Sequence, residues 1–519
     1  MFRTCPVTGF KVDSQAEGLI RANAVVAVVC LLIGGIFALL VALTRWPAIH
    51  LLGNEWYYRA LTAHAINMLF FWIVFFEVAG LYFGSAVVLS APLAWPRLAW
   101  LAFILMVGGA ALTDLMIFTG QGTVLMTSYY PLKASPFFYL GIILFAVGAL
   151  IACAVFFATL VVAKREKTYG EGSYPLFTFG LAAAAIIAVL TLAHGAIIYI
   201  PTFLWSLGLI PKLDAAMYRL IWWGFGHSSQ QINVSAMVAV WYALASLTVG
   251  AKPVNEKICR TAFYFYPLFI LIASAHHLQV DPGVSSAWKI WNTGYFMHLA
   301  ILASMIHAMA ITAAVEKAQR AKGVGRGLFD WLARAPWGNP AFSGLFLSMV
   351  GFGFFGGITG VTYGTEQINI VAHNTYRIPG HFHGTVVAGT SLAFMAITYY
   401  VLPLIFRRQV AFPSLARIQP WLFGLGMYGV AGFLMLAGSY GIPRRHWDIT
   451  FTGAPFAFEW DPAGITMLSL FGLSALLAIL GGALFVLIAV VTVFFGKRVE
   501  KTEDVTFPVS APAERTVYA

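Results

Sequence analysis

Six histidines lie within or at the ends of long apolar segments, where an ionisable side chain is unfavourable and therefore points to a function. Imidazole is a common protein ligand for haem iron and for copper or non-haem iron. A single histidine in such a segment is more often a hydrogen-bonded packing residue, whereas an adjacent pair is rarer and favours metal binding. The six are His64, His227, His276, His277, His381 and His383.

The spacing of the last two histidines adds a geometric argument. His381 and His383 are two positions apart, so on a helix with about 100° per residue they point to nearly opposite faces. One helix can then serve two cofactors. If these are haems, one histidine leaves its iron five-coordinate, and the other shares its haem with a partner, for which His64 is available. His227, His276 and His277 remain for a separate metal with an open coordination position.

The composition indicates what kind of scaffold positions these residues. Of the 519 residues, 60% are hydrophobic and 10% are charged, whereas a soluble domain has roughly 25% charged residues. The mean hydropathy of +0.82 agrees. A net charge of +11 would suggest nucleic-acid binding in a soluble protein. Here the cations lie in short loops between apolar segments, so we expect a membrane protein that contacts lipid and binds no nucleic acid.

The apolar segments have the length of membrane-spanning helices, which need about 20 residues each. The sequence therefore predicts an all-α fold, a polytopic membrane bundle of about twelve transmembrane helices in one catalytic domain, 1–519. The polar tail 497–519 is expected to be disordered and cytoplasmic. The approximate spans are 20–44, 60–90, 97–120, 136–163, 174–206, 215–248, 261–278, 288–316, 341–363, 378–406, 418–441 and 462–496.

Cations concentrate in alternate loops, and the positive-inside rule makes that side cytoplasmic. We therefore expect a bacterial inner-membrane protein with both termini in the cytoplasm. The segment 1–20 lacks the pattern of a removable signal peptide, and the four cysteines form no C-x-x-C motif. The cation-rich loops contain Lys164, Arg165, Lys167, Lys252, Lys257, Arg260, Lys317, Arg320, Lys322, Arg326, Arg407, Arg408, Lys497 and Arg498.

This topology brings the six histidines to one depth. His64 and the pair His381 and His383 begin their spans from the outside, and His276 and His277 end theirs there. His227 lies roughly ten residues, or about 15 Å, from the outer end of its span. Unrelated packing histidines would not be expected to agree in depth, so the set favours a haem or metal site in the outer half of the bilayer.

Several motifs surround these residues. They are LTAHAINMLFF, WWGFGH, AHHLQVDPG, RGLFDWL, WGNPAF, VAHNTYRIPGHFHG and IPRR. With these motifs the chain resembles subunit I of haem-copper oxidases, particularly the B-type branch, over nearly its whole length. The resemblance implies the subunit I fold, two haems and one copper ion, called copper B. The low-spin haem is expected to be haem b, and non-haem iron is less favoured than copper.

The resemblance also assigns a role to each histidine. It makes His64 and His383 the ligands of the low-spin haem and His381 the proximal ligand of the high-spin haem. It makes His227, His276 and His277 the ligands of copper B. It further places His373, Arg444 and Arg445 near the haem propionates, where guanidinium groups suit paired carboxylates. The alternative for the two arginines is an ordinary solvated loop end.

One position departs from the pattern of the oxygen-reducing members. Those proteins have a tyrosine one helical turn after the first copper ligand, and this chain has Gln231 there. Splitting O2 in one step needs four electrons, of which the metals supply three and the tyrosine the fourth. Reducing two NO molecules to N2O and water needs only two electrons. Known nitric oxide reductases of the superfamily also lack the tyrosine, and Gln231 would offer bound NO a neutral hydrogen-bonding group.

The alternative is an oxygen reductase that takes its tyrosine from the next helix, as one branch of the superfamily does. Tyr264 and Tyr266 are the candidates, but they lie near the cytoplasmic start of that span, too far from the metal. The expected proton route is also altered. Tyr242 is retained, whereas Ala303, Ile306 and Met309 replace the usual hydroxyls. In their place, Ser304 and His307 either pack or form another route.

We therefore expect the catalytic subunit of a respiratory nitric oxide reductase, with His227, His276, His277, His381 and Gln231 at its reaction site. Electrons would come from a partner subunit with a copper centre or from a cytochrome c. The first alternative is a B-type terminal cytochrome c oxidase that reduces O2. The second, least favoured alternative is a haem-binding membrane protein without catalytic activity.

Overall fold

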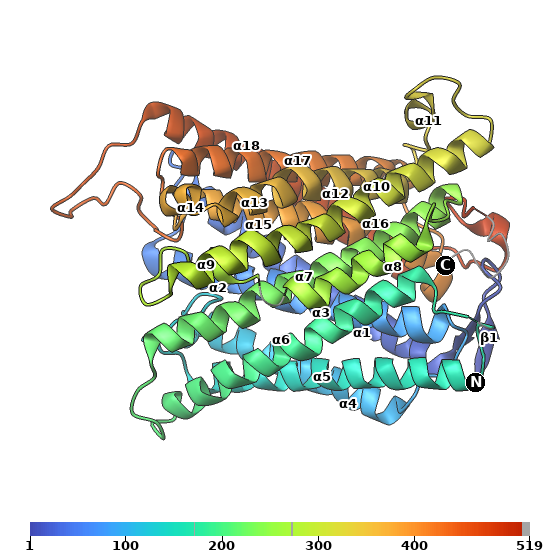
Figure 1. Ribbon diagram of the computed structural model, residues 1–519, viewed down its shortest axis with the longest axis horizontal. Coiled ribbons are helices and arrows are strands. Elements are labelled where there is room, and N and C mark those ends of the chain that lie inside the picture. The colour runs from blue at the N-terminus through green and yellow to red at the C-terminus, as the bar shows by residue number, and fades with distance from the viewer. Residues whose placement is uncertain (171, 271–272, 511–519) are drawn as a thin grey trace.

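The fold is a bundle of long helices that run roughly side by side along one axis (Figure 1). The computed structural model describes residues 1–170, 172–270 and 273–510. Within them, eleven helical segments are long and apolar enough to cross a membrane. The N-terminal strand β1 and the helix α11 lie at one end of the bundle, and α9 and α14 lie at the other (Figure 1). The prediction of a polytopic all-α membrane bundle is confirmed, with one small addition at the N-terminus.

The first half of the bundle surrounds the segment that carries His64. The elements are β1 (Phe2–Thr4), β2 (Lys11–Asp13), α1 (Ser14–Arg45), α2 (Asn54–Ile66), η1 (Asn67–Trp72), α3 (Ile73–Tyr82), η2 (Phe83–Val87), α4 (Pro96–Phe118), α5 (Pro136–Arg165), α6 (Leu176–Ser206) and α7 (Ala215–Val249). The strands β1 and β2 pair as a short antiparallel hairpin. Asp13 caps α1 by accepting from the backbone N–H groups of Gln15 and Ala16.

The second half carries the remaining histidine segments. The elements are α8 (Glu256–Phe265), η3 (Tyr266–Ile270), η4 (Ala275–His277), α9 (Ser286–Trp291), η5 (Asn292–Met297), α10 (His298–Ala321), α11 (Asp330–Ala333), α12 (Pro340–Val350), η6 (Gly351–Gly357), α13 (Ile358–Gly364), α14 (Glu366–Ala372), α15 (Arg377–Phe382), η7 (His383–Ser391), α16 (Leu392–Val401), η8 (Leu402–Phe406), α17 (Pro413–Ser439), α18 (Pro462–Phe495) and η9 (Thr502–Asp504).

The predicted span 261–278 is the one that differs most from a regular helix. It comprises α8, the π-helix η3 and, after residues 271–272, which lie outside the described part, the short 3-10 turn η4. The adjacent histidines His276 and His277 lie in this turn. The turn is anchored by Asn292, which accepts from the Ala275 N–H over 2.9 Å, and by Asn369, which donates to the His276 carbonyl over 2.8 Å.

Stretches of π-helix interrupt the helices close to the histidines. The π-helix η1 begins three residues after His64, η7 begins at His383, and η6 packs against η7. Such wide turns are frequent at functional sites, because the extra residue changes the direction of the neighbouring side chains. Here they coincide with the helices that carry the proposed haem ligands.

The chain after α18 does not fit the expectation of a disordered tail as far as it is described. Lys497 and Val499 pair with the backbone of 407–409, since the Gln409 N–H donates to Lys497 O and the Val499 N–H donates to Arg407 O. The side chains of Val499 and Phe507 are buried. The Ser510 N–H donates to Leu247 O near the end of α7 over 2.8 Å. The prediction is therefore wrong for 497–510, while 511–519 lie outside the described residues.

Candidate functional site

His64 and His383 come from different helices and face each other. Their rings are nearly parallel, at 16°, with centroids 6.3 Å apart. A metal–imidazole bond is about 2 Å long, so two imidazoles on opposite sides of one ion have ring centres about 6 Å apart. The Nδ1 atoms of His64 and His383 donate to Gly34 O and Pro379 O over 3.0 and 2.7 Å. These bonds leave both Nε2 atoms available for an iron.

The bond to Gly34 depends on close packing of α1 against the His64 helix. A Cβ atom on residue 34 would lie 2.7 Å from Met68 Cγ, a distance that real side chains do not adopt. Glycine at this position therefore permits the approach that brings the Gly34 carbonyl to His64.

His381 is directed by different neighbours. Its Nδ1 lies 2.8 Å from Thr359 Oγ1, and that hydroxyl itself donates to Phe355 O over 2.6 Å. The hydroxyl therefore accepts from His381, which leaves the Nε2 of His381 as a ligand atom. Tyr363 packs edge-on against the imidazole, with centroids 5.3 Å apart. A Cβ atom at Gly360 would lie 3.1 Å from His381 Cε1, so glycine leaves room beside the ring.

His227, His276 and His277 form a compact cluster whose candidate ligand atoms lie within 4.8 Å of one another. His227 Nδ1 and His277 Nε2 are 3.4 Å apart. His276 Nδ1 donates to Ala273 O over 2.9 Å, which leaves its Nε2 as the ligand atom. His277 stacks on Trp223 at 3.7 Å and 7°. Three nitrogen ligands suit a catalytic metal, because they leave one position open.

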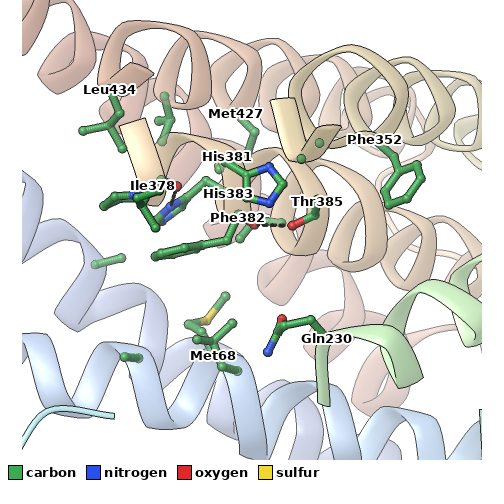
Figure 2. Close-up of a pocket in the computed structure, with 18 of the residues that line it drawn as sticks. Met68, Gln230, Phe352, Ile378, His381, Phe382, His383, Thr385, Met427 and Leu434 are labelled. Atoms are coloured by element: carbon green, nitrogen blue, oxygen red, sulfur yellow. Dashed lines mark hydrogen bonds between the residues drawn. The ribbon is translucent and has the colours of Figure 1, made fainter. Parts of the chain in front are cut away.

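A cavity of about 890 Å³ joins these groups. It lies at the upper end of the range of about 300–1,000 Å³ for ligand pockets, and its wall is mainly apolar. In Figure 2, an open space separates the segment bearing His381 and His383 from Met68 and Gln230 on the facing side. The predicted site residues on its wall are His64, His227, Gln231, His276, His277, His381, His383, Arg444 and Arg445. The structure thus brings the predicted residues together, and His373 alone among them is not on this wall.

Arg444 and Arg445 indicate that the cavity suits a negatively charged group. Burial and the adjacent Arg445 lower the pKa of Arg444 to about 9. Burial likewise lowers the pKa of Arg445. Among the described residues, no carboxylate forms an ion pair with either of them or with Arg45 on the same wall. Buried charges need partners, so these residues fit the carboxylates of a haem.

His373 lies in the electrostatic surroundings of this arginine cluster. Its pKa is lowered to about 4, first by burial and then by Arg444, with smaller effects of Arg219 and Arg445 opposed by Asp281. Asp281 holds Arg219 in a bidentate pair at 2.6 and 2.8 Å. His373 therefore lies near the cluster, where the resemblance places it, although it does not line the cavity.

Gln231 lines the cavity together with Gln230 and has intermediate exposure. Among the described residues of the wall there is no tyrosine. Tyr266 instead shares a hydrogen bond of 3.0 Å with Ser304, and Tyr264 is 56% exposed on the outside of the bundle. Neither candidate phenol therefore lines the cavity that contains the three-histidine cluster.

Ser304 and His307, for which packing and a proton route were both open, are part of a polar network. The Tyr242 hydroxyl lies 2.9 Å from His307 Nδ1, and the Tyr266 ring lies 5.6 Å from the same imidazole. Ser304, bonded to Tyr266, also lines the cavity. Two hydrogen-bonded pairs, Tyr242–His307 and Ser304–Tyr266, thus lie beside each other, and Ser304 of the second pair is on the cavity wall.

Several supporting residues could not be predicted from the sequence. Thr359, Gly34, Trp223 and Arg45 each act through a contact with a residue distant in the chain. Arg45 donates to Tyr57 Oη over 3.0 Å and lies 5.0 Å from the centroid of the Tyr376 ring. A cation at the outer end of a predicted span was the only available signal for Arg45. Trp223 lies in the WWGFGH motif, and nothing in the local pattern pointed to Thr359 or Gly34.

Comparison with known proteins agrees with this geometry. The family described as cytochrome c and quinol oxidase polypeptide I matches residues 19–472. Cytochrome c oxidase subunit 1 of Thermus thermophilus is 30% identical over 401 residues, 75% of this chain and 69% of that protein. A haem-copper oxidase subunit I+III of Aeropyrum pernix is 26% identical over 460 residues, 84% of this chain and 52% of that protein.

A solved structure extends the similarity to the whole fold. One chain of a haem-copper terminal oxidase dimer, determined by cryo-electron microscopy, superposes with a TM-score of 0.88 and 26% sequence identity. The superposition covers 97% of this chain and 88% of that one. The helix arrangement described above is therefore shared nearly from end to end.

Proposed function

The chain belongs to the cytochrome c and quinol oxidase polypeptide I family, subunit I of the haem-copper oxidases, and on that premise we propose that it reduces nitric oxide. The reaction joins two NO molecules with two electrons and two protons to give N2O and water. The observation that carries the proposal is the cavity wall, which has Gln231 and no phenol among its described residues. Four-electron reduction of O2 would need the redox help of a phenol.

The histidines fit two haems and one further metal, for which copper is favoured over non-haem iron. When bound, these groups would supply one-electron chemistry and the positions at which a gas molecule is held. His64 and His383 would hold the low-spin haem. His381 would hold the high-spin haem from one side, with His227, His276 and His277 holding the second metal.

Other side chains of the site would neutralise the haem carboxylates, orient a metal ligand and contact the substrate. Arg444 and Arg445 would pair with haem propionates, whose negative charge would offset both the burial of Arg444 and its repulsion by Arg445. Trp223 fixes the plane of His277 by stacking. The amide of Gln231 can donate to or accept from a bound NO dimer without changing its own charge. Electrons would be supplied at the outer side by a partner subunit or a cytochrome c.

A terminal oxidase that reduces O2 is the second candidate, and a specific observation favours it. The relatives found by sequence carry the names of cytochrome c oxidase subunits. In that case a phenol would have to approach the metal cluster by a rearrangement of the region around Tyr266.

The deciding experiment measures both gases with the purified, haem-loaded protein. We expect N2O formation that accounts for the NO consumed, together with slow O2 consumption. Metal analysis of the same sample would give the ratio of copper to iron. Rapid O2 consumption with negligible N2O formation would overturn the proposal in favour of the terminal oxidase.

The variants Gln231→Leu and Gln231→Tyr sharpen this test. Leucine keeps the approximate volume but removes hydrogen bonding, and we expect a loss of roughly tenfold in NO turnover, equivalent to one hydrogen bond of about 1.4 kcal/mol. Unchanged NO turnover in the leucine variant would mean that the amide has no role. The tyrosine variant tests whether a phenol at this place raises O2 turnover relative to NO turnover.

A further inference from the structure

A buried carboxyl group lies one side chain away from the cavity wall. Glu77 of α3 is 6% exposed and lies within a membrane-spanning segment. No ion pair of Glu77 occurs among the described residues. Burying an uncompensated charge at such a place is very unfavourable, so the neutral carboxylic acid is the stable form.

The contact of Glu77 with the facing helix α7 is polar. One terminal atom of the Asn233 side chain lies 2.9 Å from Glu77 Oε1, and the other lies 3.4 Å from Gln230 Oε1. Gln230 in turn donates to Ser229 Oγ over 3.2 Å and lines the cavity. Asn233 and Gln230 therefore link the carboxyl group to the cavity wall, where Figure 2 shows Gln230.

The Asn233 amide suits both protonation states of Glu77. When Glu77 is a carboxylic acid, its O–H donates to the Asn233 oxygen, and the Asn233 nitrogen donates to Gln230. When Glu77 is a carboxylate, the amide turns and its nitrogen donates to Glu77 Oε1, the orientation that satisfies an ionised acceptor. The amide thus stabilises the carboxyl group before and after it releases a proton.

The contact between Glu77 and Asn233 lies close to the level of the cavity, where the reaction would consume protons. Asn233 is six residues beyond His227 on α7, which corresponds to about 9 Å along the helix. Gln230 and Gln231 lie between these two levels and both line the cavity. The thiol of Cys153 on α5 also lies near Glu77, but a thiol is a far weaker acid than a carboxyl group and would not compete for the role.

We propose that Glu77 stores a proton as a neutral carboxylic acid and delivers it to the reaction cavity at the Gln230 wall. In this step a water molecule that enters beside Gln230 from the cavity accepts the proton as the O–H bond of Glu77 breaks, and it passes the proton on to the reduced substrate oxygen, while the Asn233 amide turns so that its nitrogen donates to the carboxylate. A proton taken up from the membrane surface restores the acid. The inference rests on the proposed redox function only in that the reaction consumes protons, which holds for NO and O2 alike.

The test compares Glu77→Gln and Glu77→Asp in the complete, haem-loaded protein. Infrared difference spectra between reduced and oxidised protein should contain a carboxylic-acid band that is lost in Glu77→Gln and shifted in Glu77→Asp. Turnover with whichever gas the protein reduces should fall by about 100-fold in Glu77→Gln, the lower end for loss of a general acid. The aspartate variant should recover much of it.

The matched control is Asp114→Asn, which removes another buried carboxyl group. Asp114 accepts from Asn67 over 2.8 Å and does not line the cavity. It should keep turnover and the infrared band. Haem absorption and the binding of carbon monoxide should be unchanged in all variants, because the reaction site itself is intact.

Two results would overturn the proposal. One is parental turnover and proton uptake in Glu77→Gln, which would leave the Tyr242–His307 network as the route. The other is an infrared band that survives in Glu77→Gln. If Glu77→Gln fails to bind haem, Asn233→Leu keeps the carboxyl group but removes its contact, and it must then shift the band and slow turnover. If the protein reduces O2 instead of NO, the proposed function is wrong, but the test of Glu77 still applies because both reactions consume protons.

Discussion

The two histidine sites differ in how many ligands the protein would supply to each metal. At His64 and His383, two nearly parallel imidazoles with ring centroids 6.3 Å apart face each other and would together hold one haem. At His381, one imidazole lines a cavity whose wall also holds the three-histidine cluster. A closed site suits electron transfer and an open one suits a gas substrate, although one short segment supplies a ligand to each.

The largest effect is expected from His277→Ala at the open site. Removing one of three ligands should abolish binding of the second metal and reduce turnover below detection, while the low-spin haem spectrum persists. The paired variant His64→Leu should do the reverse, losing the low-spin spectrum and keeping the second metal. Metal analysis and absorption spectra check both. Loss of both centres in either variant would mean that the two sites are not separable.

A smaller effect is expected from Thr359→Val, which removes the hydroxyl that accepts from His381 Nδ1. Outer partners of metal-bound histidines typically contribute about 10–100-fold in activity or affinity, and we expect a decrease of that size in turnover. Thr359→Ser, which keeps the hydroxyl, is the control. Equal activities of the valine and serine variants would show that the orientation of His381 does not depend on this bond.

Arg444→Gln tests whether the buried arginines serve carboxylates of the haems. Losing one charge-assisted bond of about 1.4 kcal/mol would lower the midpoint potential of the affected haem by about 60 mV. Potentiometric titration of both haems measures the change and identifies which haem is nearer. Arg444→Lys should give a smaller shift, because the charge is kept. Unchanged potentials in the glutamine variant would contradict the pairing.

The smallest effect is expected from Trp223→Phe, which keeps an aromatic face against His277 but reduces its area. Stacking of aromatic rings contributes about 0.5–1.5 kcal/mol, so we expect roughly a two- to threefold decrease in affinity for the second metal. Competition with a chelator measures it. Trp223→Leu should weaken binding further, and a leucine variant as tight as the parent would show that stacking is unimportant here.

The helices and the histidine set were predictable because both follow from local signals. Apolar length fixes a membrane span, and spacing along it fixes depth, so His64, His227 and His381 could be brought together without coordinates. The neighbours that orient them could not be predicted. Thr359 reaches His381 across 22 positions, and Gly34 reaches His64 across 30, and neither pairing leaves a trace in local sequence.

Two further features could not be predicted for the same reason, because they depend on residues distant in the chain. The 3-10 turn at Ala275–His277 depends on Asn292 and Asn369, which lie later in the chain. Glu77 is a single acid within an apolar segment, and its proposed role depends on Asn233, which approaches it from α7. Local sequence patterns thus identify the polar residues whose burial is unfavourable, whereas the role of each residue depends on its tertiary contacts.

The last described residues have a practical consequence for how the protein can be extended. Ser510 donates to the carbonyls of Leu247 and Thr248 in the final turn of α7, where helix carbonyls otherwise lack partners. The tail thus serves as a C-terminal cap supplied from more than two hundred residues away. A fluorescent or affinity fusion joined directly after α18 would strip this cap from the helix that carries His227, whereas one joined beyond Ser510 would leave it in place.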